Sequence, residues 1–140
     1  MNSQLEHANL CVADIEPMTE FLLQVFPEFR IRGGGLDGRG RAWRHVGDDD
    51  TYLALQEATT RRDAPWVPYS GEPGLNHLAY VVDDVDALVK RLATLGMSPN
   101  LVATEHPARK RVYFHDPEGN DWEFVQYFTT DPSERNDYSR

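Results

Sequence analysis

The sequence has a single cysteine, no long apolar run and fewer basic than acidic residues, and each shortage excludes a class of protein. Cys11 has no second cysteine with which to form a disulfide within the chain. No run approaches the roughly 20 apolar residues that a membrane-spanning helix needs, and the N-terminus lacks the basic and then apolar pattern of a signal peptide. We therefore expect a cytoplasmic protein.

The deficit of positive charge argues against nucleic-acid and membrane partners. The chain has 14 Lys and Arg against 23 Asp and Glu, which gives a formal net charge of −9 at pH 7. No basic cluster lies on a predicted helix, so neither a phosphate backbone nor an anionic lipid surface would be attracted. With 40% apolar and 26% charged residues in 140, the composition is that of an ordinary globular protein.

The first half of the sequence predicts one strand, one helix and three further strands. Leu5–Ala13 alternates partly between apolar and polar residues, as a strand with one buried face does. Asp14 is a predicted helix N-cap, and apolar residues at helical spacing follow it as far as Pro27. Three strands are then predicted in FRIR, RAWRHV and TYLALQEA, separated by the turns GGGLDGRG and GDDD.

The same order of elements returns after a connector at 59–73, which contains three prolines and little periodicity. The strand LNHLAYVVD precedes a helix over 85–95, which is capped by Asp83 or Asp84 and ended by Gly96. Strands follow in MSPNLVA, KRVYFHD and WEFVQYF, with the turn DPEGND before the last. The sequence therefore predicts an α+β fold of two tandem βαβββ modules, at 1–58 and 74–128, with an extended or flexible tail at 129–140.

The repeat gives each module one histidine on its first strand and one polar residue on its last. These are His7 with Gln56 and His77 with Glu123, at separations of 49 and 46 residues. Either histidine alone is more often an ordinary half-buried strand residue. Two imidazoles and a carboxylate together suit Zn, Ni, Mn or Fe(II), and Glu123, in the apolar stretch WEFVQYF, would be costly to bury without a cation. The sequence thus predicts a divalent metal site.

Other side chains are weaker candidates for a part in catalysis. Tyr113 lies in the strand before Glu123 and His106 in the loop before that strand, and either would transfer a proton if it faced the site. His115 alternates onto the face of Tyr113. Four arginines flank strands and could bind a substrate carboxylate, although solvated surface charge is their commoner use: Arg41, Arg44, Arg109 and Arg111.

The chain resembles the vicinal oxygen chelate superfamily, which includes glyoxalase I, extradiol dioxygenases and bleomycin-resistance proteins. The segments LNHLAYVVDDVDAL and VYFHDPEGNDWEFVQY carry the resemblance, which covers nearly all of the chain as a single domain, 1–140. It implies two βαβββ modules whose curved mixed sheet surrounds a cleft, a small-molecule substrate and a homodimer. It also implies that the residues at the four metal-ligand positions of glyoxalase I are His7, Gln56, His77 and Glu123.

The resemblance leaves three functions open. In a lyase or isomerase like glyoxalase I, which we favour, Glu123 would be both ligand and base, but Gln56 stands where glyoxalase I more often has glutamate, and an amide is no base. In an Fe(II) dioxygenase, His7, His77 and Glu123 would form the facial triad, with His106 or Tyr113 assisting proton transfer, although the chain is short for one. The third function is metal-free sequestration of a drug or metabolite.

Overall fold

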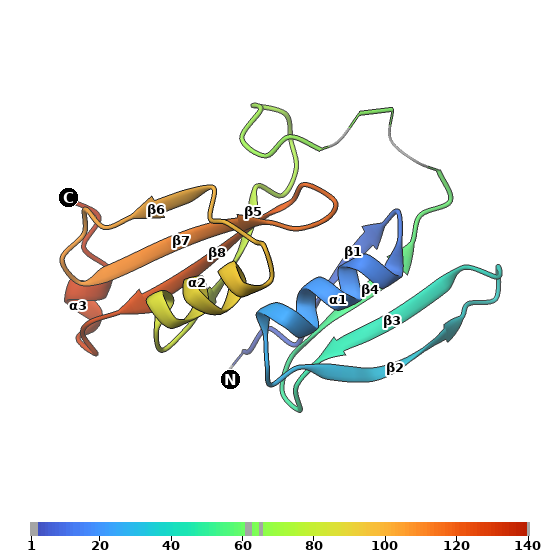
Figure 1. The fold of residues 1–140 in the computed structure, drawn as a ribbon, viewed down its shortest axis with the longest axis horizontal. Helices are drawn as coiled ribbons and strands as arrows, with labels where there is room; N and C mark the ends of the chain where they lie inside the picture. The colour runs from blue at the N-terminus through green and yellow to red at the C-terminus, as the bar shows by residue number, and fades with distance from the viewer. Residues whose placement is uncertain (1–2, 61–62, 65, 140) are drawn as a thin grey trace. The chain divides into compact units, whose positions relative to one another are not determined.

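The computed structural model describes residues 3–60, 63–64 and 66–139. The chain divides into two compact units, Met1–Pro65 and Trp66–Arg140. In each unit one α-helix packs on a four-stranded sheet (Figure 1).

The first unit follows the predicted order of elements. Its sheet has the strand order β1-β4-β3-β2, in which β1 and β4 are parallel and the other neighbours antiparallel. Asp14 caps the helix by accepting the backbone N–H of Glu16, and apolar residues of the helix are buried, among them Met18 and Leu22. The elements are β1 (His7–Val12), α1 (Ile15–Val25), β2 (Arg30–Leu36), β3 (Ala42–Gly47) and β4 (Tyr52–Glu57).

The second unit repeats this arrangement and adds a short helix near the C-terminus. Its sheet has the strand order β5-β8-β7-β6. As in the first unit, the strands that come first and last in the sequence, β5 and β8, are parallel neighbours, and the other neighbours are antiparallel. The elements are β5 (His77–Val81), α2 (Val85–Thr94), β6 (Leu101–Ala103), β7 (Arg109–His115), β8 (Asp121–Tyr127) and α3 (Pro132–Arg135). The predicted α+β fold with two βαβββ repeats is confirmed, with one sheet in each unit.

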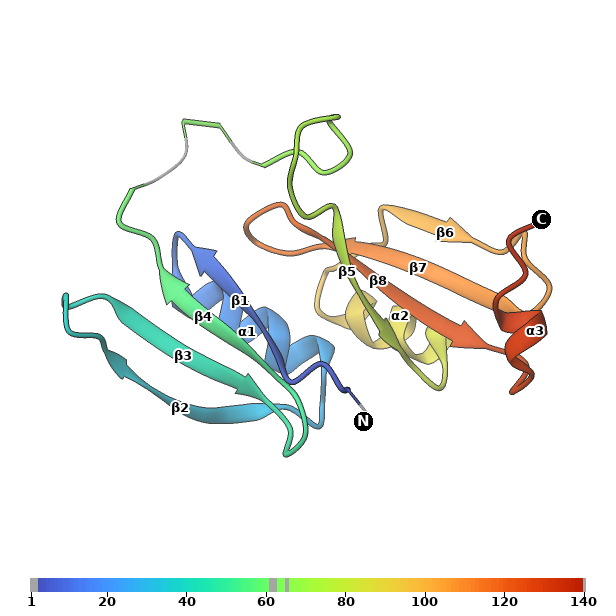
Figure 2. The ribbon, with the colours of Figure 1, turned by 180° about the vertical axis from the view of Figure 1, so that it is seen from behind.

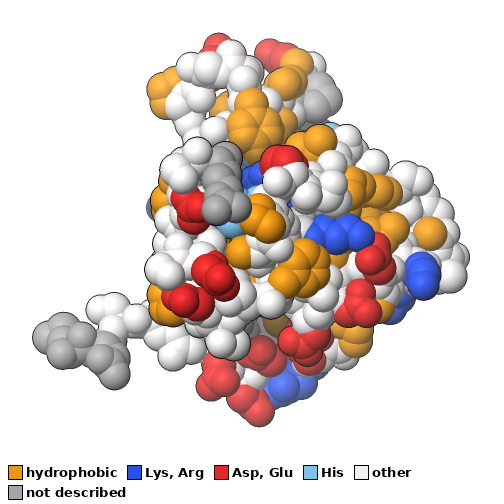
Figure 3. Space-filling view, turned by 90° about the vertical axis from the view of Figure 1, so that its left-hand side faces the viewer, with side chains coloured by type: hydrophobic (Ala, Val, Ile, Leu, Met, Phe, Trp, Pro, Cys, Tyr) orange, Lys and Arg blue, Asp and Glu red, His pale blue; other side chains and the backbone are white. Residues whose placement is uncertain are grey.

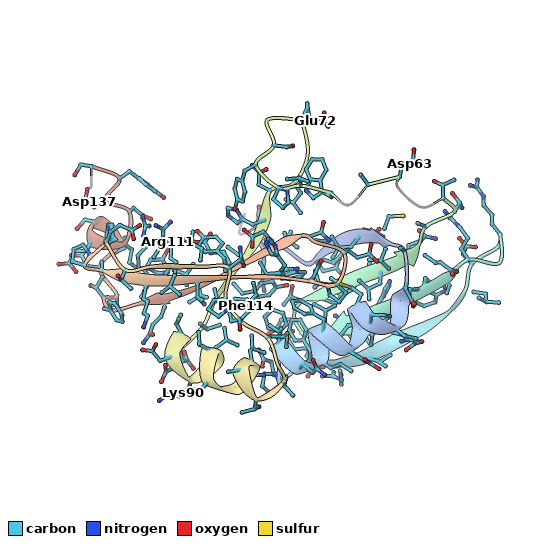
Figure 4. All side chains as sticks on the ribbon, turned by 45° about the horizontal axis from the view of Figure 1, so that its top comes forward. Asp63, Glu72, Lys90, Arg111, Phe114 and Asp137 are labelled. Atoms are coloured by element: carbon cyan, nitrogen blue, oxygen red, sulfur yellow. The ribbon has the colours of Figure 1, made fainter. Side chains whose placement is uncertain are left out.

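Each sheet has a helix face and an open face, and strand alternation divides the side chains between them. In the second unit, Figure 4 shows Phe114 on the side of α2 and Arg111 on the opposite side of the sheet. Figure 2, seen from behind, shows that α2 does not cover this open face, nor does α1 cover the corresponding face of the first sheet. Glu123 pairs with Tyr113 on the open face, whereas Trp122 is buried with Phe114. The candidate site residues therefore lie on the open faces.

Two segments differ from the prediction. Gly33–Gly35, predicted as a turn, belong to β2, because they pair with residues 43–45 of β3 and the hydrogen bonds of that ladder offset the low strand preference of glycine. The tail is not simply extended, since Asp131 caps the helix α3 and the guanidinium of Arg135 lies 4.0 Å from the ring centre of Tyr127 in β8.

The described part of the chain contains no helix that is both long enough and apolar enough to cross a membrane. In the view of Figure 3, Asp and Glu side chains are spread over the surface with fewer Lys and Arg side chains between them, as the net charge of −9 leads one to expect.

Candidate metal-binding and catalytic site

His77 and Glu123 come together on adjacent parallel strands of the second sheet. His77 pairs with Asp121, so Glu123 lies two residues further along β8 and points to the same face. The Nε2 atom of His77 is 3.0 Å from Oε2 of Glu123, whose residue is only 7% exposed. An imidazole nitrogen and a carboxylate oxygen thus converge, and these are two of the donor types that divalent transition metals bind.

Tyr69 lies against the other side of the His77 ring. Its hydroxyl oxygen is 2.7 Å from Nδ1 of His77 and 3.4 Å from Oδ2 of Asp121. Burial and the nearby carboxylates of Asp121 and Glu123 raise the pKa of the Tyr69 hydroxyl. A hydrogen bond to the far nitrogen of a histidine fixes the ring orientation of a metal ligand. No sequence pattern pointed to Tyr69, because it lies in the connector and outside any periodic element.

Tyr113 and Arg111 flank Glu123 from the neighbouring strand β7. Burial, followed by the hydrogen bond to Glu123 and the charge of that carboxylate, raises the pKa of Tyr113 well above its usual range. The Tyr113 hydroxyl therefore stays protonated and donates to Glu123. The Nη1 atom of Arg111 is 3.9 Å from Oε1 of Glu123, which is too long for a hydrogen bond but close enough to offset the negative charge.

His106 lies in a different environment from the His77–Glu123 pair, and its part in proton transfer stays a prediction. It is 5% exposed, its Nδ1 accepts the backbone N–H of Ala108 at 3.1 Å, and its Nε2 is 3.0 Å from the carbonyl oxygen of Asp137. Both ring nitrogens of His106 therefore have partners within its own unit. The contacts of His106 fit a structural part in holding the C-terminal segment.

His7 and Gln56 share the open face of the first sheet but lie apart on it. His7 pairs with Tyr52 and Gln56 with Cys11, so four residues of β4 separate them, about 13 Å along the strand. The offset of two residues that joins His77 to Glu123 leads in this unit to Ala54. The side-chain amide of Gln56 donates to Oδ2 of Asp37 at 2.9 Å. Gln56 therefore does not occupy the register position of Glu123, and its being a metal ligand stays a prediction.

His7 has one ring nitrogen engaged and its ring face covered. Its Nδ1 is 2.6 Å from Oε2 of Glu6, and its ring stacks on Tyr52 with 4.8 Å between ring centres. The ring of His45 lies 4.6 Å from the same tyrosine. Since Glu6 engages Nδ1, the nitrogen through which His7 would bind a metal is Nε2.

The four arginines divide between the faces. Arg44 pairs with Glu16 of α1 at 2.7 Å, on the helix face, and Arg41 pairs with Asp37 at 2.7 Å in the turn after β2. Arg109 and Arg111 alternate onto the open face of the second sheet, the face of Glu123. Within the second unit, these two arginines share the face of the His77–Glu123 pair.

Among residues 3–60, 63–64 and 66–139, no three His, Cys, Asp or Glu side chains gather as a metal site. The candidate donors form one close pair in the second unit and one histidine in the first, and the chemistry of the pair fits a divalent ion. A cavity of about 220 Å³ in the second unit contains neither member of the pair; it lies beside the C-terminal segment and is lined by residues that include His106, Phe128 and Glu134. We therefore take the converging donors, and not this cavity, as the candidate site.

Comparisons with known proteins agree with this fold. The sequence profile described as the Glyoxalase/Bleomycin resistance protein/Dioxygenase superfamily matches residues 4–124. No curated protein sequence matches the chain. A glyoxylase/bleomycin resistance protein/dioxygenase domain from Frankia sp. EAN1pec is 21% identical, with 91% of this chain and 99% of that chain covered and a TM-score of 0.75.

Two further solved structures are similar at the level of the fold. A mutant of the fosfomycin resistance protein FosX from Listeria monocytogenes, complexed with Mn(II) and 1S,2S-dihydroxypropylphosphonic acid, is 20% identical, with 93% of this chain and 95% of that chain covered and a TM-score of 0.68. A glyoxalase family protein from Enterococcus faecalis is 17% identical, with 87% and 96% covered and a TM-score of 0.71. Because the family profile spans most of its length, the chain belongs to the glyoxalase/bleomycin resistance protein/dioxygenase superfamily.

Proposed function

We propose that this protein is a divalent-metal-dependent enzyme that acts on a small oxygen-chelating substrate, and that His77, Glu123 and His7 are its metal ligands. The observation that supports this most is the 3.0 Å approach of His77 Nε2 to the buried carboxylate of Glu123. A buried carboxylate is costly unless a cation or strong hydrogen bonds compensate it. The similar FosX structure contains Mn(II) and a small oxygen-rich molecule, which makes such an ion the first to test.

The residues around the pair suit proton transfer. When bound, a divalent ion supplies Lewis-acid stabilisation of negative charge that develops on a substrate oxygen. Glu123 accepts the substrate proton, and Tyr113, whose raised pKa keeps it protonated, donates a hydrogen bond to Glu123 or to a substrate oxygen. Tyr69 holds the ring of His77. These residues fit lyase or isomerase chemistry in which Glu123 is the single base. Gln56 cannot be a second base, because its side chain is a neutral amide and is hydrogen-bonded to Asp37.

A second candidate function is an Fe(II)-dependent dioxygenase. Without Gln56, the proposed ligands are two imidazoles and one carboxylate, which is the ligand type of the non-haem iron facial triad. The same residues would hold the iron, and the protonated hydroxyl of Tyr113 would donate a hydrogen bond to a substrate oxygen.

The metal proposal is tested by isothermal titration of the purified protein with Mn(II), Zn(II), Ni(II) and, without oxygen, Fe(II). We expect His77→Ala and Glu123→Gln to weaken binding at least 100-fold and His7→Ala to weaken it at least 10-fold. Glu20→Gln is the matched control for the loss of a carboxylate, because Glu20 is an exposed glutamate of α1. Unchanged affinity in both His77→Ala and Glu123→Gln would overturn the proposal.

Activity then separates the functions. Turnover of a hemithioacetal with Ni(II) or Zn(II) would support the lyase or isomerase, and oxygen-dependent cleavage of a catechol with Fe(II) would support the dioxygenase. Tight binding of a planar drug without any metal would support sequestration and contradict both. Sedimentation of the same samples tests the expected homodimer.

A further inference from the structure

We propose that Arg111 forms an anion subsite beside Glu123 and binds a carboxylate or phosphonate group of the substrate in exchange for the side chain of Glu105. This inference rests on the proposed function, because it takes the His77–Glu123 pair as the reaction centre. It adds the class of substrate: a small molecule that carries chelating oxygens and, next to them, an oxyanion.

The position of Arg111 comes from strand alternation in β7. Four side chains of this strand lie on the open face, and Tyr113 stands directly opposite Glu123 in the ladder. Figure 4 shows Arg111 on the side of the sheet away from α2. Its Nη1 atom is 3.9 Å from Oε1 of Glu123. A group bound to Arg111 would therefore lie immediately beside the carboxylate of the site.

Glu105 shows what kind of group the guanidinium of Arg111 binds. The Nη2 atom of Arg111 donates to Oε1 of Glu105 at 2.5 Å. The Glu105 side chain is 65% exposed and that of Arg111 27% exposed. Exposed ion pairs of this kind contribute little to stability, so Glu105 can leave at small cost. The vacated guanidinium would offer paired N–H donors, which match the oxygens of a carboxylate, phosphate or phosphonate.

The surroundings of Arg111 favour anion binding by its guanidinium over a purely structural role. If Arg111 served only to hold Glu123, its donors would point at that carboxylate, whereas Nη2 points at Glu105 and the contact with Glu123 exceeds hydrogen-bond length. Arg109 lies two residues away on the same strand face, about 7 Å distant. Its Nε atom is buried and has no hydrogen-bond partner within the part of the chain that the structure describes. Two guanidinium groups on one face raise the local positive potential.

The test titrates the metal-free protein with inorganic phosphate and, separately, with acetate, while the arginine Nε–H signals are followed by NMR. We expect a saturable shift of the Arg111 signal with either anion. Arg111→Gln should abolish saturable binding, and Glu105→Gln should tighten it at least threefold because the internal competitor is gone. Lys110→Gln is the matched control, since Lys110 is the neighbouring cation on the helix face and pairs with Asp86 at 2.6 Å.

Glu105→Gln keeps the test decisive even if Arg111→Gln folds poorly, because it changes only an exposed side chain and predicts a gain. Arg111→Lys separates anion recognition from charge balance: lysine keeps the positive charge near Glu123 but loses the paired donors, so anion affinity should fall at least fivefold while Mn(II) affinity stays within threefold. Unchanged anion affinity in both Glu105→Gln and Arg111→Lys would overturn the inference.

Metal titrations make the two possible failures distinguishable. If Mn(II) binding depends on His77 and Glu123 but anions bind equally well without Arg111, only the subsite is overturned. If anions bind through Arg111 but His77→Ala and Glu123→Gln leave Mn(II) affinity unchanged, the proposed metal site fails and the anion subsite stands as a binding site alone.

Discussion

The hydroxyl oxygen of Tyr69 lies 2.7 Å from Nδ1 of His77, on the opposite side of the ring from Glu123. The imidazole ring of His77 thus connects the segment before β5 to strand β8. Because both nitrogens have partners, the ring cannot turn without losing a contact on each side. Tyr69 is a positioning residue in the proposed site.

Tyr69→Phe should weaken Mn(II) binding about 10-fold, since loss of a hydrogen bond to the far nitrogen of a metal-binding histidine typically costs this much. Isothermal titration measures it. Tyr138→Phe is the control, because Tyr138 is an exposed tyrosine of the C-terminal segment that keeps its ring contact with Arg109. Equal affinity of Tyr69→Phe and the unchanged protein would show that Tyr69 does not orient His77.

Asp84, and not Asp83, caps α2, because its Oδ1 accepts the backbone N–H of Ala87 at 2.9 Å. Asp84→Ala should lower the free energy of unfolding by about 1 kcal/mol. Asp83→Ala removes the same charge one residue earlier and should change it by less than about 0.5 kcal/mol. Urea unfolding of the two variants compares them directly, and a larger loss in Asp83→Ala would contradict the assignment.

Asp116 organises the turn before β8 and should be costly to remove. Its carboxylate accepts the backbone N–H groups of Glu118 and Asn120 at 2.9 Å and the indole N–H of the buried Trp122 at 3.0 Å. Asp116→Ala leaves these donors without their acceptor, so the free energy of unfolding should fall by about 3 kcal/mol. Asp63→Ala, at an exposed aspartate, should change it by less than about 0.5 kcal/mol in the same urea series.

Asp37 should titrate at unusually low pH. The pKa of Asp37 is lowered from 3.8 to about 2, chiefly by the hydrogen bond from the backbone N–H of Arg41. Burial opposes this shift, and the backbone N–H of Arg39 and the side chain of Arg41 add to it. A carboxyl group with a lowered folded pKa stabilises the fold above its unfolded pKa and loses this contribution as the pH falls from 3.8 towards 2.

The variant Arg41→Gln separates the two contributions of residue 41. The backbone N–H remains, so the pKa of Asp37 should rise only part of the way towards its usual value. Carboxyl NMR titration measures both proteins. A complete return to the usual value would mean that the side chain, and not the backbone, holds the carboxylate.

Periodicity and caps predicted the fold because they are local. The alternation of WEFVQYF correctly put Glu123 on the face opposite Trp122, and the helical spacing after Asp14 correctly predicted α1. The glycines of β2 were wrongly predicted to form a turn. Their strand conformation depends on hydrogen bonds to β3, and such a contact between separate segments cannot be read from the local sequence.

The details of the site depend on strand register, which the sequence does not reveal. Equal spacing along the chain made Gln56 look like the partner of His7, but the ladder puts Ala54 at the offset that Glu123 occupies. Tyr69 and His106 lie in irregular segments, whose side-chain directions follow from tertiary contacts alone. The positions of His77 and Glu123 on the first and last strands of one module were predictable, because both residues lie within regular strands.

The common strand order of the two units has a consequence for how such a protein can diversify. The second copy gathers an acid, a phenol and a guanidinium around His77, whereas in the first copy His7 stacks on Tyr52, whose ring also lies against His45. One strand order thus carries different side chains at matching positions, so each half can change its chemistry without a change of fold.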